Sequence, residues 1–303
     1  MTNVVCVLHG GCAVPEWLAD VARTGRLYLT VNDPADHPYG APPPGASVTE
    51  NATPRGFAEN VNAALSKVFV DDDQEAACVV NFDMQLEGSS LDALAGVLGD
   101  QPGVGVVGAV LQGTDGAPIF SVGTWPTPLK EFLRASGLRS PALVAAQRRL
   151  LRRRRGWAAR NSAPAGAVRP LHSHEYLPWT CLAIRRQAWT DVGPLDERFP
   201  LYGEDIDWSL RCHQSRWGLV VSDCGSVVHF ERATRGPRAD SLYEVSHLEL
   251  NRKWGWDASL QWQRRGLRAR RSWPLRRWTE PLDWSHLTNI DASPRMNGAA
   301  DDA

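Results

Sequence analysis

The chain has 303 residues, of which 43% are hydrophobic and 22% are charged, so it can bury a large core and is not a disordered chain. Its formal net charge of -1 gives no overall attraction to a polyanion, and we expect no nucleic-acid partner. No apolar run approaches the ~20 residues of a membrane helix, and the N-terminus lacks the pattern of a secretion signal. The six scattered cysteines form no CxxC pair and fit reduced core residues, so we expect a cytoplasmic protein.

The first half of the chain alternates between strand-like and helical runs. Apolar, β-rich runs predict strands at 3–8, 26–31, 76–82 and 103–111. Helical patterns fall between them, at 14–24, 55–69 and 89–98, and a Pro/Gly-rich loop covers 32–47. This order predicts an α/β fold with a mainly parallel central sheet and helices on both faces, in which ligands bind beyond the carboxyl ends of the strands.

The second half predicts further helices and short strands. Helical patterns occupy 127–156, 203–214 and 241–256. The run 176–186 is a strand that leads into a helix, and 217–223 and 225–230 are two short strands. A Trp/Arg-rich stretch and the polar end "NGAADDA" follow. We therefore predict a catalytic domain over residues 1–256 and a helical C-terminal extension with a frayed end over 257–303.

The stretch "VVNFDMQLEG" places Asn81 and Asp83 at the end of a predicted strand. Strand alternation would send both side chains to the same side. Their oxygens suit a hard divalent cation such as Mg²⁺ or Mn²⁺, which could bridge to substrate phosphates. The alternative is a turn or a helix cap. His229, at the end of another short strand, is either a third ligand beside Asp83 or a structural histidine.

The stretch "LYGEDIDWSLRCHQ" begins a helix with three carboxylates. Glu204 and Asp205 lie at the helix start, where backbone N–H groups stabilise anions. The preceding aromatic loop would desolvate them, and desolvation would make a carboxylate a usable base. Asp207 stands four residues before Arg211, which predicts a salt bridge on the helix surface.

A longer pattern surrounds these residues. The segment 179–230 resembles the C-terminal half of the catalytic domain of family 2 glycosyltransferases, which have the GT-A fold, in the rhamnosyltransferase-like branch. The matching anchors are Arg185, Arg186, Val192, Gly193, Asp196, Glu197, Phe199, Tyr202, Glu204, Asp205, Asp207, Arg211, Gly218 and His229. "NATPRGFAENVNAA" resembles the family's nucleotide-side segment, and "VVNFDMQLEG" resembles its DxD motif. The resemblance covers about residues 3–256.

This resemblance implies an inverting transfer of a sugar, with rhamnose as the leading candidate, from a nucleotide-diphosphate donor. Asp83 and His229 would hold the divalent cation on the diphosphate, with help from Asn81. Asp205 would be the catalytic base, with Glu204 beside it. By the same resemblance, the residues near the nucleotide would be Asp33, Asn51, Gly56 and Asn62.

The sequence departs from the family at three places. The first strand ends in "LHGG", the second is followed by "TVNDPADH" and a Pro-rich insertion, and Asn81 replaces the first aspartate of a full DxD. These positions leave the donor nucleotide and a strict metal requirement open.

Two arginine-rich segments, "RRLLRRRR" (148–155) and "RRGLRARRSWPLRRW" (264–278), have two interpretations. They are solvated helix faces, or they contact an anionic membrane at its inner face or a polyprenyl-linked glycan acceptor.

Other functions stay open at this point. The chain could transfer another hexose or a furanose. It could also be a degenerate GT-A domain that binds a nucleotide sugar or a partner without turnover, or a membrane-peripheral scaffold. The intact Glu204–Asp205 pair favours an active glycosyltransferase.

Overall fold

A computed structural model describes residues 2–9, 14–23, 26–33, 41–71, 73–138, 166–199, 201–230 and 237–272. The chain divides into two compact units, and each unit is built from two stretches of sequence. Unit 1 comprises Met1–Trp125 and Arg148–Arg235, and unit 2 comprises Pro126–Gln147 and Gly236–Ala303.

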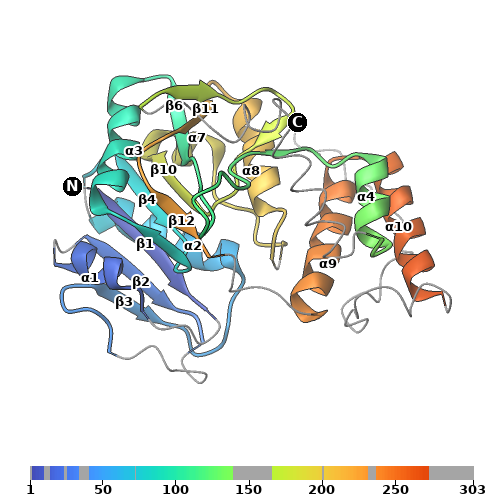
Figure 1. The fold of residues 1–303 in the computed structure, drawn as a ribbon, viewed down its shortest axis with the longest axis horizontal. Helices are drawn as coiled ribbons and strands as arrows, with labels where there is room; N and C mark the ends of the chain where they lie inside the picture. Colours follow the sequence, from blue (N-terminus) through green and yellow to red (C-terminus); the bar gives the residue numbers. More distant parts are fainter. Residues whose placement is uncertain are drawn as a thin grey trace, which may run out of the picture. The chain divides into compact units, whose positions relative to one another are not determined.

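Unit 1 contains an eight-stranded sheet in the order β3-β2-β1-β4-β10-β6-β11-β8 (Figure 1). Six of its strands run in one direction, whereas β10 and β8 run against their neighbours. The strands are β1 (Asn3–Leu8), β2 (Leu27–Val31), β3 (Ser47–Glu50), β4 (Ala76–Val80), β6 (Val104–Ala109), β8 (Val168–Pro170), β10 (Cys181–Arg185) and β11 (Gly218–Ser222).

Helices cover both faces of this sheet because the side chains of its central strands alternate between two apolar cores. One core packs Val4, Cys6 and Leu8 of β1 against α1 (Glu16–Ala22) and α3 (Gly88–Asp100). The other core packs Val5 and Val7 against α2 (Phe57–Asp71), α7 (Arg186–Val192) and α8 (Glu204–His213). The predicted α/β class, with a mainly parallel sheet and helices on both faces, is confirmed, and this is the architecture expected of a GT-A domain.

Two small strand pairs lie beyond the carboxyl edge of the parallel strands. β5 (Met84–Leu86) pairs with β12 (Val227–His229), and β7 (Gly123–Thr124) pairs with β9 (Glu175–Tyr176). β5 follows β4 after a short turn, so the first pair places β12 next to the end of β4.

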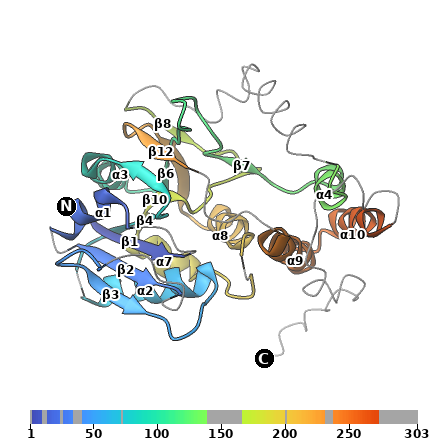
Figure 2. The same cartoon turned by 60° about the horizontal axis from the view of Figure 1, so that its bottom comes forward.

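Unit 2 consists, in its described part, of α4 (Pro128–Ala135), α9 (Pro237–Lys253) and α10 (Asp257–Arg271). The three helices run side by side in Figure 1, and Figure 2 views them nearly end-on. The structure groups α9 with α10 and α4. The division into a catalytic domain over 1–256 and an extension over 257–303 stays a prediction.

A buried polar network holds unit 2 together beside a small apolar core of Ala135, Leu248, Leu260 and Leu267. Glu131 contacts His247 at 3.1 Å, and Asn251 donates to Gln263 at 2.9 Å. Burial alone would raise the pKa of Glu131, but the charges of Arg134 and His247 outweigh it and lower the pKa to about 2. Glu131 is therefore ionised at neutral pH and links α4 to α9.

Most predicted elements of the first half are confirmed to within a few residues, but β3 falls where the loop 32–47 was expected to end and was not predicted. The predicted helix over 127–156 begins as α4, and its arginine-rich part lies outside the described residues. Within the described part of the chain, no helix is both long enough and apolar enough to cross a membrane.

Candidate active site

Asp83 and His229 meet at the carboxyl edge of the sheet. The antiparallel pairing of β5 with β12 sets His229 opposite Met84, the residue after Asp83. The His229 Nε2 atom lies 3.2 Å from Asp83 Oδ2, and both side chains are largely buried. Two residues separated by about half of the chain are thus brought together at the end of β4, as the sequence predicts.

Asn81 also lies at this edge, but strand alternation does not position it relative to Asp83. β4 ends at Val80, and Phe82 and Asp83 form a turn, so the predicted strand over 76–82 is too long. The Asn81 backbone donates to the carbonyl of Thr180 at 2.8 Å, which anchors the start of this turn beside β10. Asn81 is half-buried and follows the strand directly.

The donor set at this edge fits a hard cation in part. A carboxylate oxygen and an imidazole nitrogen suit Mn²⁺, and the Asn81 amide oxygen could join them. Among the described residues, no group of three or more His, Cys, Asp or Glu side chains is arranged to hold a metal ion. A cation here would therefore depend on oxygens supplied by a bound diphosphate or by water.

Asn51 belongs to a cluster of buried amides at the ends of β2 and β3. Its Nδ2 donates to Asn32 Oδ1 at 2.8 Å and to Asn60 Oδ1 at 2.7 Å. Asn60 also donates to Asn32, and Asn32 contacts His9 at 3.2 Å. The Arg55 backbone N–H donates to Asn32 Oδ1, so the cluster fixes the turn that leads into α2.

Asp33 and Gly56 lie near this cluster in the chain. Asp33 directly follows Asn32 after β2 and is half-buried. Gly56 precedes α2, and its N–H donates to Glu59 Oε2 at 2.9 Å, so the Glu59 side chain caps the helix. Nucleotide contact by Asp33, Asn51 and Gly56 stays a prediction.

Asn62 reaches a loop from a distant part of the sequence. Its Nδ2 donates to the carbonyl of Leu195 at 2.9 Å and to Glu197 Oε1 at 2.8 Å. Its Oδ1 accepts from the Leu195 N–H at 2.9 Å. Because the buried amide bonds Leu195 through both of its ends, it fastens α2 to the segment that precedes α8, and a direct nucleotide contact stays a prediction.

Arg211 grips the same segment from α8. Its Nη1 and Nη2 donate to the carbonyls of Val192 and Pro194 at 2.6 and 2.7 Å, and its Nε contacts Asp207 Oδ2 at 3.0 Å. The prediction of a surface salt bridge is wrong, because Asp207 is 0% exposed. The pair is a buried clamp, since the helix turns Asp207 inward, where Arg211 satisfies it.

The loop enters α8 through a left-handed turn. Tyr202 has φ 65° and Gly203 has φ 95°. A tyrosine in this region is strained, and such strain persists only where the surrounding contacts fix the backbone. Asn62 and Arg211 fix the earlier part of this loop, at Val192, Pro194, Leu195 and Glu197.

Glu204 and Asp205 are the acids that this turn presents. Burial raises the pKa of Asp205 to about 6, against the opposing backbone N–H groups, of which Ile206 N donates to Oδ1 at 2.8 Å. Burial first, and then the Asp205 charge, raise the pKa of Glu204 well above its ordinary value. Glu204 is only 5% exposed, and its Oε2 has no hydrogen-bond partner in the described part of the chain. Asp205 therefore has the properties of a general base that is ionised at neutral pH.

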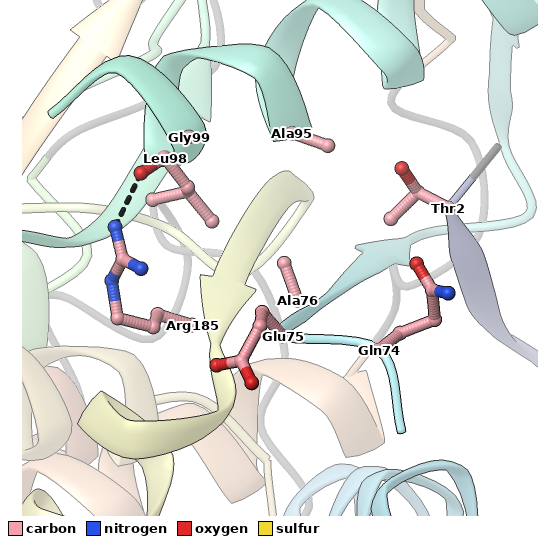
Figure 3. Close-up of a pocket in the computed structure, with 8 residues that line it drawn as sticks. All are labelled: Thr2, Gln74, Glu75, Ala76, Ala95, Leu98, Gly99 and Arg185. Atoms are coloured by element: carbon pink, nitrogen blue, oxygen red, sulfur yellow. Dashed lines mark hydrogen bonds between the residues drawn. The ribbon is translucent and has the colours of Figure 1, made fainter. Parts of the chain in front are cut away.

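The two described cavities lie apart from these acids. One, of about 190 Å³, is lined by Gln74, Ala76 and Arg185, at the amino end of β4, and Figure 3 shows Arg185 bonded to the carbonyl of Leu98 there. The other, of about 230 Å³, lies between α2 and the strands β2 and β3 and includes Asn51 and Asn60 in its lining. Asp83 and His229 contact each other, and neither described cavity includes them or Asp205 in its lining.

Three residues that support the site were assigned no site role from the sequence. Asn60 accepts a hydrogen bond from Asn51 in the amide cluster, and Glu59 caps α2. Arg211 holds the loop before α8 through the carbonyl of Val192. The helical spacing from Asp207 to Arg211 was visible, but the two carbonyls that Arg211 also binds have no sequence signal.

The sequence is similar to two kinds of known proteins. No family model matches the sequence. The N-acetylglucosaminyl-diphospho-decaprenol L-rhamnosyltransferase of Mycobacterium tuberculosis, in each of two strains, is 28% identical over 203 residues, which are 64% of this chain and 61% of that protein. The match thus spans about three fifths of the relative's length. The O-antigen biosynthesis protein RfbC of Myxococcus xanthus is 31% identical over 67 residues, 22% of this chain and 5% of that protein.

Solved structures give weaker likenesses. The structure of GalNAc-T7 with UDP, GalNAc and Mn²⁺ has a TM-score of 0.47 at 13% identity, covering 97% of this chain and 58% of that one. A likeness of this size does not establish shared chemistry. The sequence similarity to the mycobacterial relative confirms the predicted resemblance to the rhamnosyltransferase-like branch of family 2 glycosyltransferases.

Proposed function

We propose that the chain transfers a sugar from a nucleotide-diphosphate donor to a hydroxyl of a polyprenyl-linked glycan, with inversion at the anomeric carbon. The observation that carries the proposal is the contact between Asp83 and His229 at the carboxyl edge of β4. In open α/β sheets this edge is where ligands bind. The name of the mycobacterial relative supports L-rhamnose as the sugar and a lipid-linked acceptor.

The chemistry divides between two groups of residues. Asp83 and His229, with Asn81 beside them, would hold a divalent cation, which would neutralise the charge that grows on the departing diphosphate. Asp205 accepts the proton of the acceptor hydroxyl as that oxygen attacks the anomeric carbon from the side opposite the leaving group. Glu204 stands beside Asp205 at the start of α8 and is itself buried. The amides of Asn51 and Asn62, with Gly56 and Asp33, form or support the nucleotide side.

A thermal-shift screen with nucleoside diphosphates, with and without Mn²⁺, tests the donor site. We expect one nucleotide to raise Tm, and Mn²⁺ to increase that rise. Asp83→Asn and His229→Ala should lose the Mn²⁺-dependent part, whereas Asp20→Asn and His172→Ala, which alter exposed side chains of the same unit, should keep it. Unchanged Mn²⁺ dependence in both site variants would remove the cation from the proposal. Transfer to a water-soluble acceptor, measured over a panel of nucleotide sugars, then identifies the sugar.

A further inference from the structure

Unit 2 carries an exposed apolar surface on α4. Five large apolar side chains are exposed in the described part of the chain, and three of them, Leu129, Leu138 and Trp262, belong to this unit. Leu129 is 60% exposed and lies one helical turn from Phe132, whose ring meets that of Trp262 on α10 edge-on at 5.7 Å. Leu129, Phe132 and Trp262 therefore form one continuous apolar strip across two helices.

Arginines border this strip on α10. The Arg265 guanidinium lies over the Trp262 ring at 5.8 Å, and Arg268 and Arg271 follow it on the exposed face of the helix. The opposite face of α10 is buried and contains Leu260, Gln263, Gly266, Leu267 and Arg270. The helix has five arginines and one carboxylate, Asp257, which lies at its far end. α10 therefore has two different faces: its inner face packs against the other helices of unit 2, and its outer face is cationic.

We infer that this surface, made of Leu129, Phe132, Trp262, Arg265 and Arg268, binds an anionic lipid bilayer at its interface. Charge complementarity selects this occupant, because the arginines match acidic headgroups. The apolar strip beside them contains a tryptophan, the side chain that suits the boundary between headgroups and acyl chains. No spanning helix is required, since such a surface lies on the membrane. If the proposed function holds, the surface brings the chain to the membrane that contains its lipid-linked acceptor.

The structure also decides which variants can test this inference. Cutting the chain after Trp256 would remove α10 and with it half of the core of unit 2, so loss of binding would be uninformative. Substitutions on the outer face avoid this problem. Arg265→Gln with Arg268→Gln removes two exposed charges, and Leu129→Ser removes an exposed apolar side chain. The matched controls lie on unit 1: Arg23→Gln with Arg216→Gln, and Val70→Ser at a position that is 84% exposed.

The experiment is flotation of the full chain with vesicles of phosphatidylglycerol and phosphatidylcholine, compared with phosphatidylcholine alone. We expect binding to the anionic vesicles only, weakening as salt is raised. The double arginine variant should bind at least tenfold more weakly, because each basic residue near the surface contributes about fivefold and two together about 25-fold. Leu129→Ser and Trp262→Ala should each weaken binding several-fold, and both unit 1 controls should bind as the wild type does.

Three results would overturn the inference: no binding by the wild type, equal binding to neutral vesicles, or equal losses in the unit 1 controls. A fourth would be a concentration-dependent dimer that the same outer-face substitutions dissociate, since a second copy would then be the occupant. The vesicle assay uses no nucleotide sugar. Loss of vesicle binding with normal donor binding would refute only this inference, whereas the reverse result would refute only the proposed function.

Discussion

At the scale of single residues, a change at Asp205 should affect sugar transfer and leave donor binding intact. The variant Asp205→Asn keeps the shape of the side chain but cannot accept a proton. We expect kcat to fall by roughly 10²–10⁴-fold, the usual contribution of a positioned base. The thermal shift caused by the donor nucleotide should stay within error of the wild type. Asp20→Asn serves as the control, and equal kcat values in Asp205→Asn and the wild type would remove Asp205 from the role of base.

The pKa of Asp205 predicts how transfer depends on pH. Burial raises this pKa to about 6, so the base is protonated below pH 6 and ionised above it. We expect kcat to rise with pH along a limb whose midpoint is near 6, and we assign that limb to the Glu204–Asp205 pair because the two carboxyls interact. A kcat that is flat from pH 5 to 8 would contradict this assignment.

The raised pKa of Glu204 predicts that the protein loses stability as pH rises, which is opposite to the effect of a carboxylate whose pKa is lowered by folding. Its pKa is raised in the folded protein by burial and by Asp205, so the folded state binds the proton more tightly than the unfolded state. The stability that this proton contributes is present at low pH and is lost as pH rises through the folded pKa. Glu204→Gln should therefore raise Tm at pH 8, by roughly 2–4 °C for each kcal/mol recovered, and change it little at pH 5. Calorimetry at both pH values measures this, and a lower Tm at pH 8 would contradict it.

At the scale of elements, the segment before α8 depends on Asn62. Asn62→Ala leaves the Leu195 N–H and carbonyl without their side-chain partner in a buried setting, and such losses cost about 1–3 kcal/mol each. We expect the free energy of unfolding to fall by a similar amount and kcat to fall with it, because the loop that leads to Glu204 and Asp205 loses the hydrogen bonds that Asn62 makes to Leu195 and Glu197. Chemical denaturation and transfer assays measure the two effects. Ser66→Ala, on the exposed face of α2, is the control and should change neither.

Some elements of the fold could be predicted from the sequence and others could not. β1 and α8 were predicted almost to the residue, because a buried strand and an amphipathic helix leave strong periodic patterns. The contact of Asp83 with His229 followed from a family motif. The antiparallel direction of β10, the edge strand β3 and the two hydrogen bonds of Asn62 to Leu195 were not predicted, because strand direction, a short edge strand and a side-chain bond to a distant backbone leave no periodic pattern in the sequence. Asp207 was placed on the surface because helical spacing predicts a pair but not which side faces inward.

At the scale of the whole molecule, unit 2 depends on the close approach of α10 to α4. A Cβ atom on Gly266 would lie 2.8 Å from the carbonyl oxygen of Phe132 and 2.9 Å from the Ala135 Cβ. Gly266→Ala should therefore push the helices apart and destabilise this unit, by about 1–3 kcal/mol. Limited proteolysis should then cut unit 2 earlier than unit 1. Gly96→Ala, on α3 of unit 1, is the matched control: a Cβ atom there would meet nothing within 4 Å, so the same change should raise stability by up to about 1 kcal/mol through helix propensity.

The interleaving of the two units has a consequence for synthesis of the chain. α4 leaves the ribosome long before α10, because the second stretch of unit 1 and all of α9 are translated between them. α9 emerges first and brings His247 to Glu131, but the close contact of α10 with α4 cannot form until Gly266 has been made. Unit 1 can complete its sheet with β11 during that interval, so the order of translation favours a finished sheet before the helical unit closes.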